Sequence, residues 1–490
     1  MKTSIHIPTD PEALRRMLIR EPESTWTTAG ETMALALFHR AAVRVPAYKK
    51  FLRTHGVTHE RVRTLKDFAH VPPMEKKNYL RAYPLEELVW DGNLTAASTT
   101  SVSTGSTGQP FFWPRDGERI RETTQLFELM FRSYFHIERV PTLFIVAYAM
   151  GMYVAGVYTT QCFTDISSRT KLVLATPGLN PDDVLRIVKE LAPRFAQLVI
   201  AGYPPFIKDV LERGATEGID WERHHTKLIF GGEGFSESWR DDVRRLIGPS
   251  ATPTDAINIY GTADAAILGH ETASSIGLRR VALSDPALGR ELFQSEHALP
   301  SLVQYYPFWR FFETIENELI FSTNGVIPLI RYNIHDRGGI IPWSERVRHL
   351  SKPVPAALTW RLPFVYLFGR SDMTTILYGA NIYPDNILHA LETPGLLGTV
   401  SGRFTMETIE DKAHTQQLSI TLELKPKRTA SARLRESITH KIDQALQKVN
   451  AEYKNHRASM PHLGSATVIL LPHGSPDFKK SLKSLSKTRR

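Results

Sequence analysis

The segment KLIFGGEGFSESWRDDVRRL, residues Lys227–Leu246, places an apolar run directly before a charged, helix-like stretch. The run KLIFGG is continuously apolar and ends in glycine, which is typical of a strand buried on both faces of a sheet. The stretch SESWRDDVRRL begins with serine, a good N-cap, and carries its acids early. This strand-then-helix order predicts one β–α unit of an α/β sheet.

Similar runs flank this segment on both sides. QLVIAG at Gln197–Gly202 and INIYG at Ile257–Gly261 predict two more strands of the same kind. The most apolar stretch, Leu143–Tyr158, is shorter than the roughly 20 residues that a membrane-spanning helix needs. It favours a buried strand followed by a helix or loop, and no membrane span is expected. The first ninety residues are expected to be mostly helical.

A smaller domain is predicted from about Asp372 onward. LSITLEL at Leu418–Leu424 alternates apolar and polar residues, as a half-buried strand does. ATVILL at Ala466–Leu471 supplies another strand. One apolar helical stripe lies between them: Leu434, Ile438, Ile442, Ala445 and Val449.

The length of 490 residues exceeds what one hydrophobic core usually supports. We therefore expect an α/β fold with two domains. Residues 1–371 form a large multi-layer α/β N-terminal domain, and residues 372–490 form a smaller, mobile α+β lid domain.

Composition restricts the class of protein. The single cysteine, Cys162, excludes an intramolecular disulfide and a cysteine-rich zinc cluster. The N-terminus lacks an apolar signal-peptide core, and a cytoplasmic location is expected. A net charge of +9 favours anionic partners such as nucleotides, CoA, nucleic acid or a membrane surface. A basic nucleic-acid-binding protein stays an alternative, although no groove-reading helix motif is present.

The segment STGSTGQP, Ser103–Pro110, is rich in glycine and hydroxyl side chains. Closely spaced glycines let successive backbone N–H groups point into one concavity and hold an anion. The hydroxyl groups add donors for phosphate oxygens. Taken alone, such a run is also typical of a flexible linker. The candidate phosphate-binding residues are Ser103, Thr104, Gly105, Ser106, Thr107 and Gly108.

Six segments in order resemble those of one enzyme family. They are FAHVPPMEKKNYLR (Phe68–Arg81), SVSTGSTGQP (Ser101–Pro110), FGGEGFSESWRDDVRRLIG (Phe230–Gly248), INIYGTADAAILGHE (Ile257–Glu271), ELIFSTNGVIPLIRYNIHDRGGI (Glu318–Ile340) and FGRSDMTTILYGANIYPDNI (Phe368–Ile387). Together they resemble the phenylacetate–CoA ligase branch of the adenylate-forming enzymes.

This resemblance implies activation of a carboxylic acid, aromatic or otherwise apolar, with ATP and Mg²⁺. The products are acyl-AMP and pyrophosphate, and the acyl group then passes to the CoA thiol. Transfer to an amine or a carrier protein, and adenylylation as in coenzyme F-390 synthetases, stay open as alternatives. A catalytically dead scaffold is a further alternative. A homodimer is a compatible quaternary state.

The resemblance also implies roles for individual residues. Asp264 and Glu271 are candidate Mg²⁺ ligands, with Asp264 where the family has glutamate and Ala263 where it has a hydroxyl residue. Asp336 would bind both ribose hydroxyls. Arg331 and Arg370 would each meet phosphate or ribose, with a surface salt bridge as the alternative for both. The nucleotide site would include Gly232, Glu233, Tyr260, Gly261, Asp336 and Arg370, beside the phosphate segment.

The remaining roles concern the lid and the acid. Asp372 is the expected hinge, and Lys487, or else Lys483, is the expected catalytic lysine of the lid. The acyl pocket would be lined by Tyr148, Met150, Tyr203 and Pro204, although plain core packing explains these four residues equally well.

Overall fold

The computed structural model describes residues 5–103, 110–294, 299–346, 358–370, 375–391, 396, 399–411, 414–460 and 466–476. The chain separates into two compact units. The larger unit comprises Met1–Val102 and Phe112–Ser371, and the smaller comprises Ser103–Phe111 and Asp372–Arg490. Each unit is described by itself below.

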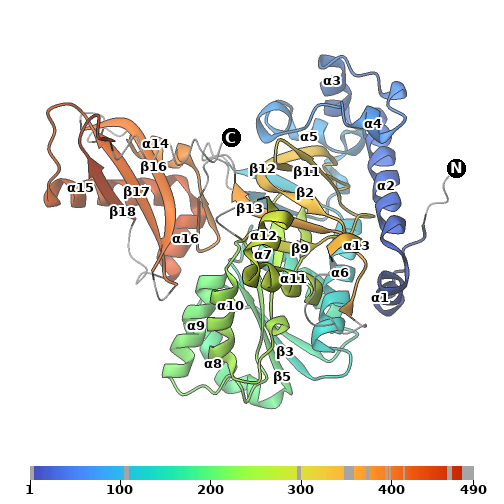
Figure 1. The fold of residues 1–490 in the computed structure, drawn as a ribbon, viewed down its shortest axis with the longest axis horizontal. Helices are drawn as coiled ribbons and strands as arrows, with labels where there is room; N and C mark the ends of the chain where they lie inside the picture. Colours follow the sequence, from blue (N-terminus) through green and yellow to red (C-terminus); the bar gives the residue numbers. More distant parts are fainter. Residues whose placement is uncertain are drawn as a thin grey trace. The chain divides into compact units, whose positions relative to one another are not determined.

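An 11-stranded sheet forms the centre of the larger unit (Figure 1), in the order β10-β11-β12-β13-β9-β8-β7-β6-β5-β3-β4. Its parallel part contains β3 (Thr142–Ala147), β4 (Leu172–Ala175), β5 (Gln197–Gly202), β6 (Lys227–Gly231) and β7 (Ala256–Thr262). Its antiparallel part contains β8 (Ala266–His270), β9 (Ser301–Gln304), β10 (Phe311–Ile315), β11 (Glu318–Thr323), β12 (Leu329–Ile341) and β13 (Phe364–Arg370). The three strands predicted from apolar runs are β5, β6 and β7, and the α/β fold class is confirmed.

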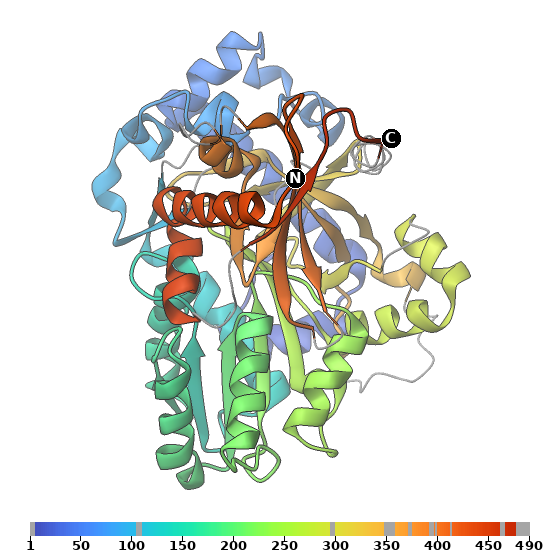
Figure 2. The same cartoon turned by 90° about the vertical axis from the view of Figure 1, so that its left-hand side faces the viewer.

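Helices connect the parallel strands and cover the sheet. Helices α8 (Pro181–Leu191), α9 (Pro204–Thr216) and α10 (Glu237–Ile247) pack side by side in that order, and Figure 2 shows the green helices lying along the strands. The Ser236 hydroxyl caps α10 by accepting from the Trp239 N–H at 3.1 Å, as the sequence predicts. Strand β3 leads into α7 (Val154–Ser167), so the apolar stretch Leu143–Tyr158 is indeed a strand followed by a helix.

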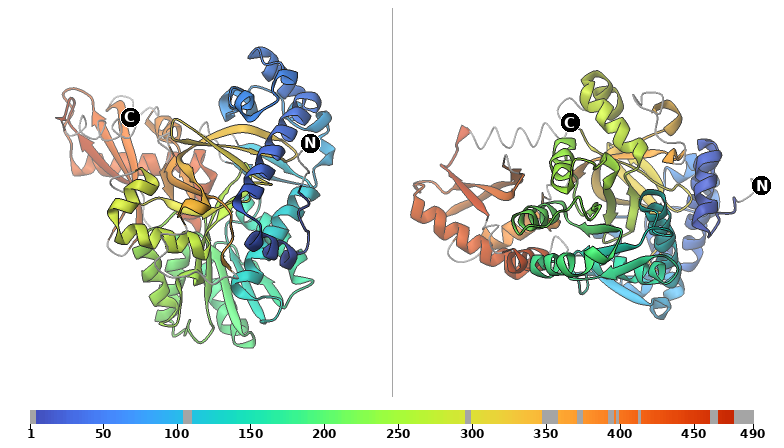
Figure 3. Two further views of the ribbon diagram at one scale, coloured as in Figure 1. Left: turned by 45° about the vertical axis from the view of Figure 1, so that its right-hand side comes forward. Right: turned by 90° about the horizontal axis from the view of Figure 1, so that it is seen from below.

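The N-terminal residues are mostly helical, as expected. Figure 3 shows α2 (Glu23–Arg44) in dark blue beside the antiparallel strands β10, β11 and β12, which it contacts. The other α-helices described in this unit are α1 (Pro11–Arg20), α3 (Pro46–Thr54), α4 (Leu65–Phe68), α5 (Leu85–Leu88), α6 (Gly117–Phe135), α11 (Ala273–Ser284), α12 (Pro286–Phe293) and α13 (Trp343–Arg346). Strand β1 (Thr99–Ser103) pairs with β2 (Phe111–Arg115) in a separate two-stranded sheet.

Strands β12 and β13 approach each other closely at two glycines. A Cβ atom at Gly338 would clash with the carbonyl oxygen of Tyr366, and one at Gly339 would lie 2.5 Å from the Tyr366 hydroxyl. The glycines therefore let β12 continue as a strand immediately after Asp336. The backbone of Asp336 lies opposite that of Arg370 in this pair of strands.

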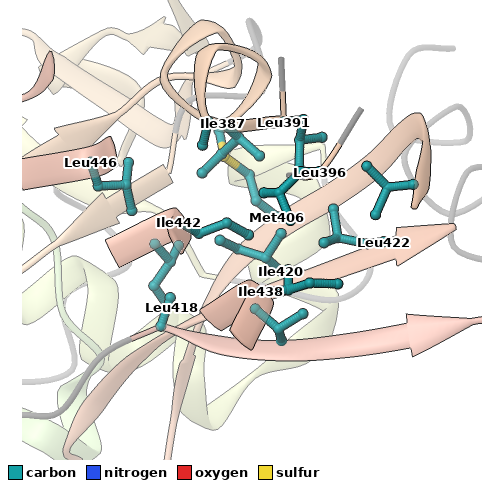
Figure 4. Close-up of a cluster of buried hydrophobic side chains, with 14 of the residues drawn as sticks. Ile387, Leu391, Leu396, Met406, Leu418, Ile420, Leu422, Ile438, Ile442 and Leu446 are labelled. Carbon is teal, nitrogen blue, oxygen red and sulfur yellow. The ribbon is translucent and has the colours of Figure 1, made fainter. Parts of the chain in front are cut away.

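The smaller unit has its own three-stranded sheet and core. Strands β16 (Val400–Glu410), β17 (Gln416–Leu424) and β18 (Thr467–Leu471) pack against α14 (Pro384–Leu391), α15 (Ala432–Val449) and α16 (Ala451–Ser459), and β14 (Thr375–Leu377) pairs with β15 (Ala380–Ile382). Figure 4 shows the buried side chains of this core: Ile387, Leu391, Leu396, Met406, Leu418, Ile420, Leu422, Ile438, Ile442 and Leu446. In neither unit do the described residues include a helix with the length and apolarity needed to cross a membrane.

Burial makes His270 a source of pH-dependent stability. Desolvation lowers the pKa of this fully buried side chain from 6.5 to about 4. Its ring nitrogens lie 2.8 Å from the Tyr306 hydroxyl and 2.7 Å from the Glu271 carbonyl oxygen. The unfolded chain therefore binds a proton near pH 6.5 that the folded chain accepts only near pH 4.

We expect the free energy of unfolding of the larger unit to fall as the pH drops from 6.5 to 4, by up to about 3 kcal/mol from His270 alone. Urea titrations followed by tryptophan fluorescence measure this unit specifically, because all eight tryptophans lie in it. The His270→Asn variant should lose this part of the pH dependence. An identical pH dependence in both proteins would contradict the assignment.

Candidate functional site

The predicted acyl-pocket residues lie at the carboxyl ends of parallel strands, where α/β proteins commonly bind ligands. Tyr148 follows β3 and Tyr203 follows β5, and their rings meet edge to face with centroids 5.2 Å apart. A Cβ atom at Gly231, the last residue of β6, would lie 3.1 Å from the Tyr148 hydroxyl. Because Gly231 has no side chain, the Tyr148 ring can lie directly against the end of β6.

The other two acyl-pocket candidates lie nearby in the chain. Met150 is half-buried, and its side chain lies against two glycines: an added Cβ would come within 2.7 Å of its Sδ at Gly156 and 3.1 Å of its Cγ at Gly178. Pro204 is buried at the first position of α9. The structure thus brings Tyr148 and Tyr203 into contact and places Met150 and Pro204 in the adjoining segments.

The glycine–glutamate turn after β6 is attached to the neighbouring strand β7. Gly232 has a φ of +93°, a conformation that favours glycine. The Asn258 side chain donates from Nδ2 to the Glu233 carbonyl oxygen at 3.1 Å, and its Oδ1 accepts from the Ile259 N–H at 3.0 Å. Asn258 therefore connects the predicted nucleotide residues of this turn with the strand that carries Tyr260. The residues around Asn258 in the sequence do not indicate this contact.

Glu271 is bound into a buried network of charges. One carboxylate oxygen accepts from Arg240 at 2.6 Å, and the other accepts from the Asn258 backbone N–H at 2.8 Å. Glu237 pairs with the same arginine at 3.0 Å and with Arg279 at 3.0 Å. All four charged side chains are at most 3% exposed. Because protein donors occupy both oxygens of Glu271, we assign it to this network and leave the metal hypothesis with Asp264.

Tyr260 and Asp336 are brought together from distant parts of the chain. The Tyr260 hydroxyl donates to Asp336 Oδ2 at 2.5 Å, which links β7 to β12. Both residues are buried, with exposed fractions of 8% and 6%. Two residues that the sequence predicts to bind adenine and ribose are thus neighbours in the folded chain. Gly261 follows directly, and a Cβ there would lie 3.1 Å from the Ala266 carbonyl oxygen.

Asp264 lies in the turn between β7 and β8 and has two partners from elsewhere. Tyr332 of β12 donates its hydroxyl to Oδ2 at 2.6 Å, and the Lys76 ammonium lies 3.4 Å from Oδ1. The Lys76 side chain is 29% exposed, whereas that of Asp264 is only 5% exposed. Among the described residues, no three histidine, cysteine or acidic side chains gather as a metal-binding cluster. One carboxylate is nevertheless a sufficient protein ligand for Mg²⁺ that is bound mainly by substrate phosphates.

Lys76 reaches this site because its segment docks onto β12. The Met74 N–H donates to the Arg331 carbonyl oxygen at 3.0 Å, and the Met74 carbonyl accepts from the Asn333 N–H at 2.8 Å. Arg331 itself pairs with Glu313 at 3.1 Å and donates to the Ala69 carbonyl oxygen at 2.7 Å. These contacts agree with salt bridging, the alternative for Arg331, although the Arg331 side chain is buried rather than on the surface. A role of Arg331 toward phosphate or ribose stays a prediction.

Several predicted residues lie outside the described part of the chain. They are Thr104, Gly105, Ser106, Thr107 and Gly108 of the phosphate segment, the hinge Asp372, and the tail lysines Lys483 and Lys487. Ser103 ends strand β1 and is buried, while only the backbone of Arg370 is described. The roles of all these residues stay predictions.

Comparison with solved structures defines the fold. The chain has the fold of the adenylate-forming ligases. A 2-hydroxyisobutyryl-CoA ligase in complex with 2-HIB-AMP and CoA in the thioesterification state matches 100% of this chain and 98% of its own, with a TM-score of 0.68 and 16% identity. The same ligase in the postadenylation state with 2-HIB-AMP matches 99% of this chain and 98% of its own, with a TM-score of 0.56 and 15% identity.

Sequence comparison then names particular relatives. The phenylacetate–coenzyme A ligase of Aromatoleum evansii is 23% identical over 390 residues, 78% of each chain, and that of Escherichia coli K12 is 21% identical over 386 residues, again 78% of each. No protein-family model matches the chain. The resemblance to the phenylacetate–CoA ligases is confirmed by these relatives.

The Glu271→Gln variant tests whether this residue is structural or a metal ligand. Loss of its charge leaves Arg240 with one carboxylate, and we expect the free energy of unfolding to fall by about 3 kcal/mol in urea titrations. The Asp242→Asn variant is a control, because Asp242 forms an exposed ion pair with Arg245 and its loss should cost less than about 1 kcal/mol. A stable Glu271→Gln protein with an altered Mg²⁺ requirement would reverse the assignment.

Proposed function

We propose that the chain activates a carboxylic acid with MgATP to give acyl-AMP and pyrophosphate, and then transfers the acyl group to the CoA thiol. The observation that carries the proposal is the contact between Tyr260 and Asp336, at 2.5 Å, beside the turn that bears Asp264. The fold and the phenylacetate–CoA ligase relatives support the same reaction. In this proposal residues 1–371 bind ATP and the acid, and residues 372–490 act as a lid that turns at Asp372.

The nucleotide would be held by groups on β7 and β12, which the hydrogen bond between Tyr260 and Asp336 connects. Asp336 accepts from the ribose hydroxyls, and the hydrogen bond from Tyr260 fixes the orientation of its carboxylate. The Tyr260 ring offers a flat apolar face for adenine. The backbone of Gly232, Glu233 and Gly261 lines the same edge, and residues 103–108 hold the β- and γ-phosphates through backbone N–H and hydroxyl groups.

Charge is the main obstacle to this reaction, because a carboxylate must attack an anionic α-phosphate. Asp264 would hold Mg²⁺, which supplies positive charge at the phosphate oxygens when it is bound. Lys76, 3.4 Å from Asp264, adds a protein cation at the same place. A lysine of the tail, Lys487 or else Lys483, completes the neutralisation between carboxylate and α-phosphate.

The acid would bind at the carboxyl ends of β3 and β5. The crossed rings of Tyr148 and Tyr203 and the thioether of Met150 form an apolar surface there, with Pro204 beginning the next helix. Such a surface suits an aromatic or other apolar acid and excludes water from the mixed anhydride. CoA is the proposed acceptor, and a carrier protein or an amine is the alternative that the same intermediate allows.

The direct test is acid-dependent release of pyrophosphate with MgATP across aromatic, branched and fatty acids, with and without CoA. Release that depends on the acid and rises with CoA is the expected result. The Asp336→Ala variant should lower kcat/KM for ATP about 100-fold, because it loses the hydrogen bonds to both ribose hydroxyls. The Asp182→Ala variant is the control, because it removes an exposed carboxylate that is distant from Asp336 in the sequence. Its kcat/KM for ATP should match that of the wild type.

Absence of pyrophosphate release with every acid, from a folded protein that binds ATP, would contradict the proposed reaction. Release that CoA does not change would contradict CoA as the acceptor and favour an amine or a carrier protein.

The two tail lysines can be distinguished by separating the half-reactions. Lys487→Ala should slow formation of acyl-AMP by about 100-fold, since it removes the cation at the transition state, and should leave transfer from synthetic acyl-AMP to CoA within a factor of three. Lys483→Ala serves as the matched control, with the same charge change four residues away. The reverse pattern would assign the role to Lys483.

A further inference from the structure

Three buried arginines lie next to one another behind the turn that carries Asp264. Arg115 comes from β2, Arg119 from α6, and Arg310 from the segment before β10, and their exposed fractions are 5%, 9% and 3%. One carboxylate, Glu122, contacts two of them, at 2.5 Å from Arg119 and 2.6 Å from Arg310. Among the described residues, no acidic side chain forms an ion pair with Arg115.

Arg115 makes its contacts with backbone and ring groups. Its Nη2 donates to the Ala263 carbonyl oxygen and lies 3.4 Å from the Ser101 hydroxyl. Its guanidinium carbon lies 5.2 Å from the centre of the Tyr158 ring. No hydrogen-bond acceptor within the described chain reaches its buried Nε. Arg115 therefore fastens the residue before Asp264 to β2, and the Asp264 carboxylate acts on its charge from a distance without forming an ion pair.

The strand that follows this turn is fastened in a similar way. Arg310 donates from Nε to the carbonyl oxygen of Ile267 in β8 at 3.1 Å. Among the described residues, the four cations Arg115, Arg119, Arg310 and Lys76 thus have two carboxylates near them, Asp264 and Glu122. Burial of charge without a counter-charge is unfavourable, and burial lowers the pKa of Arg115 although arginine stays protonated.

An anion bound at the turn would offset this excess of positive charge. In the sequence, β2 begins directly after Pro110, the last residue of the segment expected to bind phosphates. In the structure, the excess positive charge lies beside Asp264. A polyphosphate, with several charges in a small volume, matches this requirement better than a monoanion does.

We propose that Arg115 is a positioning residue for the triphosphate of ATP, and for pyrophosphate after the reaction. It holds the Ala263–Asp264 turn against β2 and supplies a buried charge, without an ion-pair partner among the described residues, that attracts the phosphates without touching them. This proposal rests on the function proposed above, because it presumes that ATP binds at Asp264.

Isothermal titration calorimetry of the full chain with MgATP, pyrophosphate and AMP tests the proposal. The Arg115→Met variant keeps a side chain of similar length without the charge, and we expect at least a tenfold weaker affinity for ATP and pyrophosphate. Affinity for AMP, which has one phosphate, should change less than threefold. The Arg115→Lys variant restores the positive charge but not the planar guanidinium with its several N–H donors. It should recover a large part of the lost affinity for ATP and pyrophosphate.

Arg240→Met is the matched control, because Arg240 is equally buried but fully paired with Glu237 and Glu271. It should lower the melting temperature with or without ATP. Arg115→Met should leave the melting temperature of the nucleotide-free protein much closer to the wild type, and should lose most of the upward shift that ATP produces.

Equal weakening of ATP and AMP, or unchanged affinity for ATP in both Arg115 variants, would overturn the inference while leaving the proposed function intact. A wild-type protein that does not bind ATP would instead overturn the proposed function, and the inference with it. If Arg115→Met does not fold, Arg115→Gln decides, because it removes the charge and keeps a hydrogen-bond donor: the proposal predicts a selective loss of affinity for ATP and pyrophosphate, and a purely structural role predicts none.

Discussion

The carboxylate of Glu271 holds together the elements on which the candidate site is built. It accepts from Arg240 of α10 with one oxygen and from the backbone of β7 with the other. Since α10 follows the glycine–glutamate turn and β7 carries Tyr260, this one side chain fixes the turn relative to the strand. The ion pair of Glu271 and Arg240 stabilises the fold only with both partners present, because removal of either would leave a charge buried without its counterpart.

The same strand connects the parallel and antiparallel halves of the sheet. β7 runs parallel to β6 on one side and antiparallel to β8 on the other. The turn between β7 and β8 therefore reverses the chain at the site and presents Asp264 there. The hydrogen bond from Tyr260 to Asp336 then links this half of the sheet to β12. Site geometry and sheet topology are in this way set by the same short segment.

The strands and helices could be predicted because each depends on a pattern of residues that are adjacent in the sequence. Continuous apolar runs define β5, β6 and β7, and a serine with early acids defines the start of α10. The contacts of the site could not be predicted in this way. Lys76 and Asp264 are distant in sequence, and nothing around Lys76 indicates its partner. Glu271 is a candidate metal ligand because its neighbours resemble a nucleotide motif, and the local sequence does not indicate its partners in the structure, Arg240 and Asn258, which come from other elements.

The attachment of Met74 to β12 also has a consequence during synthesis on the ribosome. Met74 is hydrogen-bonded to Arg331 and Asn333, about 260 residues later in the chain. At roughly 5 to 20 residues per second, translation needs on the order of 13 to 50 seconds to supply these partners. Throughout that interval the face of α2 that packs against β10, β11 and β12 lacks its native cover, and apolar surface exposed in this way favours aggregation of a nascent chain.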